Sequence, residues 1–203
     1  MESIRELLVE ELRDLYDAEK QLVKALPKMV KAASNEELGQ AFEEHLEQTR
    51  GQVERLERAF ELLDEKAKAK PCAAMKGLLT EAQEQLEEDM TEPLMDSAII
   101  CAAQKVEHYE IAGYGTVCAW ARSLGLDEVA DLLEQTLNEE KAADEKLSTI
   151  ASAVFAEAEE GMSDEEDDEE LEMDDEMEEE PVSAGKKASG KAGTMNKPRS
   201  RAV

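Results

Sequence analysis

The feature that most constrains the fold of this chain is the spacing of its apolar residues. In four long segments they recur three or four positions apart, which places them on one face of a helix. The segments cover residues 3–33, 35–70, 91–122 and 127–155. Long helices with a single apolar face are stable when they bury those faces against one another. The pattern therefore predicts an all-α bundle of four helices.

Turn signals arrange the four segments in pairs. A polar break at residues 34–35 joins the first two helices, and a glycine-containing turn at residues 123–126 joins the last two. Pro71 ends the second helix near Lys70, and a shorter apolar pattern follows over residues 73–89. We therefore expect two helical hairpins, connected by a long crossover that contains a short helix.

The charge of the chain is strongly negative. With 51 acidic and 23 basic residues the formal net charge is −28, of which −17 belongs to residues 1–156 and −11 to residues 157–203. Such a field repels nucleic acid and anionic membranes and attracts cations, including metal ions. The same charge is also explained by solubility or adaptation to salt. We therefore expect neither a nucleic-acid nor a membrane partner.

The sequence carries no segment as long and apolar as a membrane span, and its first residues lack the apolar region of a signal peptide. Its three cysteines, Cys72, Cys101 and Cys118, lack the spacing of a metal site. Ordinary thiols are typical of a reducing compartment. These features predict a cytoplasmic protein.

The composition changes after residue 156. Residues 163–180 contain 14 acidic residues in 18 positions, whereas residues 181–203 contain six lysines or arginines and no acid. Neither block has enough apolar residues to form a core. We therefore expect a folded domain over residues 1–156 and a disordered, acidic-then-basic tail over residues 157–203. The tail either increases solubility or serves docking or self-association, with a partner that the sequence does not identify.

Polar residues interrupt each apolar stripe near its middle, where a core would favour leucine. The stripes of the first, third and fourth helices each contain a glutamate, and the stripe of the second contains three other polar residues. In chain order these residues are Glu19, His45, Thr49, Gln52, Glu110 and Glu140. Four interrupted stripes indicate a polar layer across the bundle.

The spacing of these residues brings them to one height. Glu19 and Thr49 are equidistant from the first turn, and Glu110 and Glu140 are equidistant from the second. Residues equidistant from the turn of an antiparallel hairpin lie at the same height along the two helix axes. The sequences of the two hairpins also align at an offset of 91 residues, so that Glu19 corresponds to Glu110 and Thr49 corresponds to Glu140. The chain therefore contains a diverged hairpin repeat, and its three glutamates should converge.

Ionised carboxylates that converge in an apolar core must be neutralised, because burial and mutual repulsion both disfavour their charge. Carboxylates at the centre of a four-helix bundle are a known way to hold iron or manganese. The alternative is a metal-free network, in which partly protonated glutamates bond to Tyr16, Tyr114, His45, Thr49 and Gln52.

Four segments carry a resemblance to a known family. They are EELRDLYDAEKQLVKALPKM, FEEHLEQTRGQVERLE, KVEHYEIAGYGT and LLEQTLNEEKAADEKL. Over residues 3–152 the chain resembles the YciE/YciF stress-protein family within the ferritin-like superfamily. The resemblance implies a ferritin-like bundle, usually a dimer, that binds a pair of metal ions and is often labelled a ferroxidase. That label rests on analogy between folds.

The ferritin-like pattern needs single glutamates on two helices and Glu-x-x-His on the other two. Glu19, Glu110 and Glu140 match it, but Ala143 stands where one histidine is expected, and Thr49-x-x-Gln52 replaces the other motif. Substitutes lie one turn away, at His45, Glu107 and Asp144. The resemblance thus gives a set of candidate metal ligands comprising Glu19, His45, Gln52, Glu107, Glu110, Glu140 and Asp144. Because the pattern is incomplete, a weaker, mononuclear or altered site is also compatible with the sequence.

Three functions fit these observations. The first is a metal-binding protein that holds one or two iron or manganese ions and oxidises Fe(II) with oxygen or peroxide. The second is a non-enzymatic stress or scaffold protein whose polar layer fixes the helix register. The third is a manganese catalase-like activity. No residue is assigned a catalytic role by the sequence.

Overall fold

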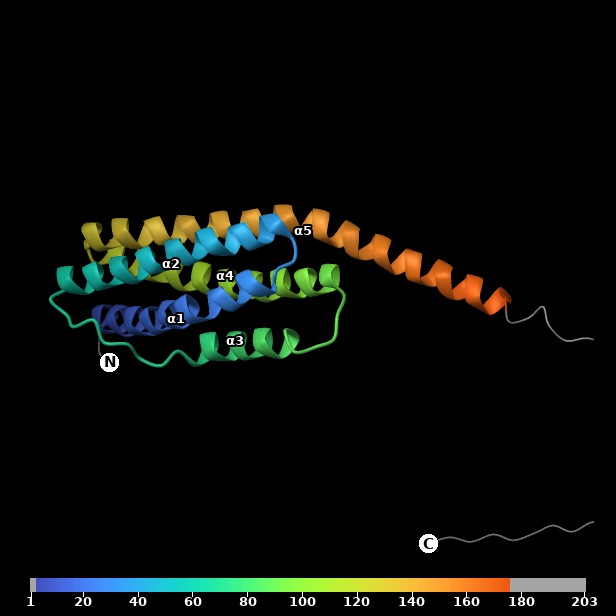
Figure 1. Cartoon of the computed structure of the whole chain (residues 1–203). Helices are drawn as coiled ribbons and strands as arrows, with labels where there is room; N and C mark the ends of the chain where they lie inside the picture. Colours follow the sequence, from blue (N-terminus) through green and yellow to red (C-terminus); the bar gives the residue numbers. More distant parts are fainter. Residues whose placement is uncertain (1–2, 176–203) are drawn as a thin grey trace, which may run out of the picture. The chain divides into compact units, whose positions relative to one another are not determined.

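The computed structural model describes the backbone of residues 3–175, and the side chains as far as residue 156 together with Glu159. Its helices are α1 (Ile4–Ala32), α2 (Glu36–Leu62), α3 (Ala73–Gln85), α4 (Glu92–Ser123) and α5 (Asp127–Asp175). The helices α1, α2 and α4 and the first part of α5 run side by side, and α3 lies along the outside of the bundle (Figure 1). The predicted ferritin-like architecture of two hairpins and a crossover helix is confirmed.

The turn between α1 and α2 is fixed by a residue of another helix. Asn35 caps α2, since its side chain accepts a hydrogen bond from the Leu38 amide at 3.1 Å. The buried Asp96 carboxylate of α4 accepts bonds from the Ser34 and Asn35 amides at 2.9 and 2.8 Å. This carboxylate connects the start of the second hairpin to the turn of the first.

The second helix is shorter than the sequence predicted, because it ends at Leu62 rather than near Lys70. Asp64 adopts a left-handed backbone conformation with φ of 55°. The Glu65 amide then bonds to the Phe60 carbonyl at 2.9 Å, which completes a Schellman motif. This motif terminates the helix, and the following segment is held against α1 by a bond from the Lys70 amide to the Arg13 carbonyl.

The second hairpin turns where the sequence predicts. Gly125 has a positive φ of 71°, and the Leu126 amide bonds to the Ala121 carbonyl at 3.0 Å. A left-handed residue costs least when it is glycine. This turn sets the level at which α4 and α5 face each other.

The last helix is longer than predicted, because α5 continues to Asp175 instead of fading near Phe155. Glutamate, methionine and leucine are good helix formers, and no proline occurs in this stretch before Pro181. The chain divides into a compact unit over Met1–Ser163 and a second unit over Asp164–Val203. The part of the predicted tail from residue 176 onward lies outside the described residues.

The core consists of two apolar clusters with the polar layer between them. One cluster contains Leu22, Phe42 and Leu147, and the other contains Leu12 and Leu133. Gly113 of α4 lets α1 approach closely, since a Cβ atom there would lie 2.8 Å from a methyl group of Leu15. None of the helices described combines the length and hydropathy that crossing a membrane requires.

Candidate metal centre

Four buried side chains from three helices meet inside the bundle. His45 comes from α2, Glu107 and Glu110 from α4, and Glu140 from α5. Each offers one ligand atom, and these atoms all lie within 4.8 Å of one another. Glu110 and Glu140 are fully buried, whereas 6% of the surface of His45 and 3% of the surface of Glu107 are exposed to solvent. We call these four residues the His–Glu group.

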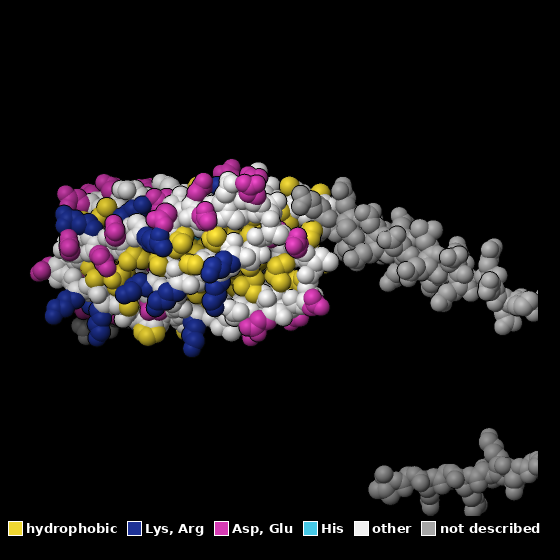
Figure 2. Space-filling model, in the orientation of Figure 1, with side chains coloured by type: hydrophobic (Ala, Val, Ile, Leu, Met, Phe, Trp, Pro, Cys, Tyr) yellow, Lys and Arg dark blue, Asp and Glu magenta, His cyan; other side chains and the backbone are white. Residues whose placement is uncertain are grey.

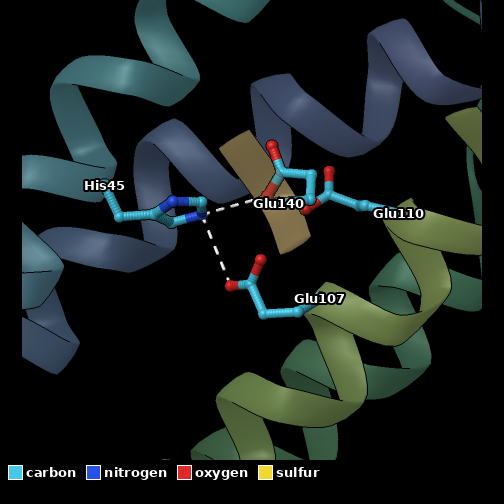
Figure 3. Close-up of side chains that lie close together, drawn as sticks. All are labelled: His45, Glu107, Glu110 and Glu140. Atoms are coloured by element: carbon cyan, nitrogen blue, oxygen red, sulfur yellow. Dashed lines mark ion pairs between the residues drawn. The ribbon is translucent and has the colours of Figure 1, made fainter. Parts of the chain in front are cut away.

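The imidazole of His45 points at two of the carboxylates (Figure 3). Its Nε2 atom lies 3.4 Å from Glu107 Oε1 and 3.8 Å from Glu140 Oε2. Its Nδ1 atom lies 3.4 Å from Gln48 Oε1, one turn along α2. In the tautomer whose Nδ1–H donates to Gln48, the Nε2 atom presents a lone pair toward the carboxylates.

The polar layer contains most of the buried atoms that lack a hydrogen-bond partner. Among the described residues, nine buried side-chain nitrogen or oxygen atoms make no hydrogen bond, and seven of them lie in this layer. They are Glu19 Oε2, His45 Nε2, Gln52 Oε1, Glu107 Oε2, both carboxylate oxygens of Glu110, and Glu140 Oε2. Buried polar atoms in native proteins are almost always paired, so this concentration marks a place where a cation could bind.

Burial and mutual repulsion dominate the electrostatics of the layer. The pKa values of Glu19, Glu107 and Glu110 are raised well above 4.5, first by desolvation and then by the neighbouring carboxylates. The pKa of Tyr114 is raised for the same reasons. Without a cation, protons must therefore neutralise part of the layer.

Glu19 lies beside the His–Glu group but outside it. It is fully buried, and its Oε1 atom accepts a hydrogen bond from the Tyr114 hydroxyl at 2.5 Å. Its charge interacts with Glu140 and with Glu110. The three glutamates singled out by spacing are thus all buried in one layer, with Glu19 held by a tyrosine of the facing helix.

Gln52 acts as a donor in this layer. Its amide nitrogen bonds to Glu140 Oε1 and, at 3.1 Å, to Glu139 Oε2. Because the amide nitrogen faces both carboxylates, Gln52 orients Glu140 in this conformation. The predicted role of Gln52 as a ligand would require its amide to turn.

One residue next to the layer, an arginine, was missed by the sequence analysis. Arg55 binds both carboxylate oxygens of Glu139, at 2.6 and 2.9 Å, and donates to the buried Thr136 hydroxyl at 2.7 Å. Its charge lowers the pKa of Glu19, against the larger effect of burial. A signal was present, since Arg55 follows Gln52 by three residues on the same helix.

Asp144 is not brought into the group. Its side chain is 23% exposed, with His108 Nε2 at 3.5 Å and the Gln104 amide at 3.3 Å. Its charge still raises the pKa of Glu107. The side chain of His108 is 69% exposed, so this histidine lies at the surface.

Two other residues that could have joined the network bond elsewhere. The Thr49 hydroxyl donates to the His45 carbonyl of its own helix at 2.7 Å. The Tyr16 hydroxyl donates to Glu57 at 2.6 Å, away from Glu19. Of the two tyrosines considered from sequence, only Tyr114 contacts the carboxylates.

The donor set fits iron or manganese. It combines one imidazole nitrogen with carboxylate oxygens, and both ligand types suit these metals. The unpaired oxygens and the unpaired Nε2 atom face one another inside the group. The described residues therefore contain a buried histidine and glutamate cluster that could hold a metal ion.

Comparison with known proteins gives the family. The model of the family described as Domain of unknown function (DUF892) matches residues 3–160. Protein YciF of Escherichia coli (strain K12) is 49% identical over 152 residues, which make up 74% of this chain and 92% of YciF. The match thus spans nearly the whole relative and the whole bundle described above.

Solved structures agree with this assignment. The crystal structure of the E. coli stress protein YciF has a TM-score of 0.75 at 47% identity, covering 77% of this chain and 99% of that chain. The structure of YcfI from Rhodopseudomonas palustris has a TM-score of 0.72 at 47% identity, covering 73% and 94%. The chain belongs to the DUF892 family and is a YciF-like protein.

Proposed function

We propose that this protein binds iron or manganese in the His–Glu group and oxidises Fe(II) with oxygen or peroxide. The observation that supports the proposal is the set of seven unpaired buried atoms in one polar layer. A divalent cation would pair with these atoms and replace the protons that the raised pKa values require. The acidic surface would raise the local concentration of cations.

The four ligands define one strong position. His45, Glu107, Glu110 and Glu140 would each contribute one bond to a single ion. A second ion could use Glu19 and share Glu110 and Glu140, but it would have only oxygen ligands. We therefore propose one tightly bound ion, with any second ion bound more weakly.

The surrounding residues would support this position. Gln48 would keep the His45 ring in the tautomer that leaves Nε2 free, and Gln52 would hold Glu140 in place. Tyr114 would hold Glu19 beside the group by its hydroxyl bond. A bound metal would supply the redox-active centre, while the apolar clusters on both sides would limit the access of water.

Anaerobic titration with Fe(II), followed by addition of oxygen or peroxide, tests the proposal. The expected result is saturable binding with one strong site per chain, followed by oxidation faster than in protein-free buffer. Binding without oxidation would support the proposed metal site and contradict the proposed oxidation of Fe(II). The absence of saturable binding for both Fe(II) and Mn(II) would contradict the proposal as a whole.

The two histidines offer a matched pair of variants. His45→Ala should weaken metal binding about 10- to 100-fold, the loss typical of a perturbed metal shell. His108→Ala removes the same side chain at the surface and should leave the affinity unchanged. If His45→Ala lowers stability without changing affinity, His45 is structural and carboxylates alone must bind the metal.

The second candidate function is a metal-free layer that fixes helix register in a scaffold protein. The donors Gln52 and Tyr114, which already satisfy one oxygen each of Glu140 and Glu19, favour it. A manganese catalase-like activity is the third candidate, and peroxide consumption by the Mn(II)-loaded protein distinguishes it.

The physiological setting is also a proposal. E. coli YciF is described as a stress protein, and we extend a stress role to this chain by its 49% identity to that protein. We further propose a cytoplasmic homodimer. Light scattering of the purified protein tests the oligomeric state.

A further inference from the structure

A small apolar pocket lies directly beside the His–Glu group. It has a volume of about 30 Å³, and residues of α1, α2, α3 and α4 line it. Of its twelve lining side chains, only those of His45 and Glu107 contain nitrogen or oxygen atoms. The other ten are apolar, and four of them are no more than 5% exposed, namely Leu22, Leu26, Phe42 and Val106. Two members of the His–Glu group therefore face an apolar space.

The pocket approaches the surface between α1 and α3. Its partly exposed residues are Ala25, Leu79 and Ala103. It shares Ala25, Met29 and Leu79 with a wider surface groove of about 500 Å³ along the seam of these two helices. Figure 2 shows apolar side chains at the surface over the part of the bundle where α1 and α3 run. The pocket thus lies between an apolar part of the surface and the His–Glu group.

The size of the pocket suits a molecule with two heavy atoms. A single water needs roughly 10–15 Å³ of such space, and the pocket offers about 30 Å³. Dioxygen and hydrogen peroxide, the two oxidants considered for the proposed reaction, both consist of two heavy atoms. Size alone therefore admits either of them.

The polarity of the lining distinguishes between the two oxidants. Dioxygen is apolar and loses no strong hydrogen bond when it leaves water, so an apolar lining favours its uptake. Hydrogen peroxide carries two hydroxyl groups, and burial of a hydroxyl group without a partner is strongly disfavoured. In this pocket peroxide would find partners only at His45 and Glu107, which are candidate metal ligands. The lining therefore favours dioxygen.

We infer that this pocket is a binding site for dioxygen, which it holds beside His45 and Glu107. Apolar cavities in proteins take up small apolar ligands in the same way. With Fe(II) oxidised as proposed, the pocket makes dioxygen the oxidant. This consequence rests on the proposed function, whereas the binding of dioxygen in the pocket does not.

Paramagnetic relaxation by dissolved dioxygen tests the binding on the full chain without metal. Dioxygen is paramagnetic, so it speeds the relaxation of methyl protons according to the time it spends near them. Under oxygen, compared with nitrogen, the methyl groups of Leu22, Leu26 and Val106 should show a larger increase in relaxation rate than those of Leu38 and Ile150. The last two are buried in the same apolar cluster and line neither the pocket nor the groove. Equal increases in both sets would overturn the inference, because dioxygen would then be spread evenly through the core.

Filling the outer end of the pocket provides a matched pair of variants for the same measurement. Ala103→Leu adds a larger side chain at a partly exposed residue of the pocket, so the extra relaxation at Leu22 and Val106 should be lost. Ala32→Leu makes the same change at another partly buried alanine that packs against this cluster outside the pocket, and it should retain the extra relaxation. Metal is absent throughout, so the outcome is independent of the proposed metal function. Equal relaxation at Leu22 and Val106 in the two variants would overturn the inference.

Discussion

The two hairpins of the bundle have the same architecture and unequal chemistry. Each member of the His–Glu group has a counterpart 91 residues away in the other half of the repeat. The counterparts of Glu110, Glu107, Glu140 and His45 are Glu19, Tyr16, Thr49 and Thr136. Only Glu19 keeps a ligand of comparable strength, since the other three positions carry hydroxyl groups.

The hydroxyl side chains at the counterpart positions are already bonded. Tyr16 donates to Glu57, Thr49 to its own helix backbone, and Thr136 accepts from Arg55. The guanidinium of Arg55 therefore supplies a fixed positive charge on the side of the layer that lacks ligands. A repeated hairpin can thus retain a symmetric frame while its candidate metal ligands concentrate in one half.

The largest expected effect comes from replacing Glu110, and separately its counterpart Glu19, with alanine. Glu110→Ala removes a member of the group and should weaken Mn(II) binding on the order of 100-fold or more. Glu19→Ala alters the counterpart and should weaken the strong site less than about 10-fold. Competition with a fluorescent chelator measures both affinities. Equal losses would show that the two halves contribute equally and contradict the asymmetry.

Restoring a lost ligand should have the next largest effect. Thr49→Glu places a carboxylate at the counterpart of Glu140, and it should raise the number of tightly bound Mn(II) ions per chain from one to two. Thr49→Gln has a similar size without the charge and should leave the number at one. Equilibrium dialysis with metal analysis gives the stoichiometry. An unchanged number for a folded Thr49→Glu variant would show that Arg55 or the packing excludes a second ion.

The pH dependence of stability should distinguish the metal-free from the metal-loaded layer. The pKa values of Glu19, Glu107 and Glu110 are raised in the folded protein, so the folded state binds more protons than the unfolded chain above pH 4.5. The free energy of unfolding of metal-free protein should therefore fall as the pH rises from about 5 to 8, by up to about 1.4 kcal/mol per pH unit for each such carboxyl.

Urea unfolding across this pH range measures the effect. Glu110→Gln should reduce the slope, because one of the three carboxyls no longer ionises. Saturating Mn(II) should reverse it, since metal binding is favoured by deprotonated ligands. A metal-free protein whose stability rises over this range would show that the layer is ionised and stabilised by other charges.

The smallest expected effect concerns the two units of the chain. Ending the chain after Ala156 should keep the helical circular dichroism per residue of the bundle and shift the melting temperature by no more than about 3 °C. Among the described residues, Val154 is the last member of the two core clusters, and the acidic composition beyond it favours no further core. A loss of ten degrees or more would show that the tail packs on the bundle far more strongly than surface ion pairs allow.

The sequence predicted the fold well because apolar spacing and turns are local signals. The hairpin turns at residues 34–35 and 123–126 lie where predicted, and they level Glu19, Glu110 and Glu140 in one layer. The ends of helices were harder. The left-handed Asp64 ends α2 early, and aspartate carries no strong signal for that conformation.

The sequence predicted the site less completely than the fold. The height of a residue along its helix does not determine the direction in which its side chain points around the helix axis. Glu107 and Asp144 each lie one turn from a stripe glutamate, so the sequence offers both as ligands. The structure buries Glu107 in the group and leaves Asp144 at the rim. Likewise, Gln52 is buried as predicted, but the direction of its amide depends on Glu139 and Arg55 across the interface.

Anomalous diffraction from crystals of the full chain equilibrated with Mn(II) tests the metal centre most directly. The expected result is one strong peak at the manganese edge, within bonding distance of His45 Nε2 and of carboxylate oxygens of Glu107, Glu110 and Glu140. A weaker peak beside Glu19 is compatible with the asymmetry between the hairpins. Peaks confined to surface carboxylates, with the polar layer unchanged, would contradict the assignment of this layer as a metal site.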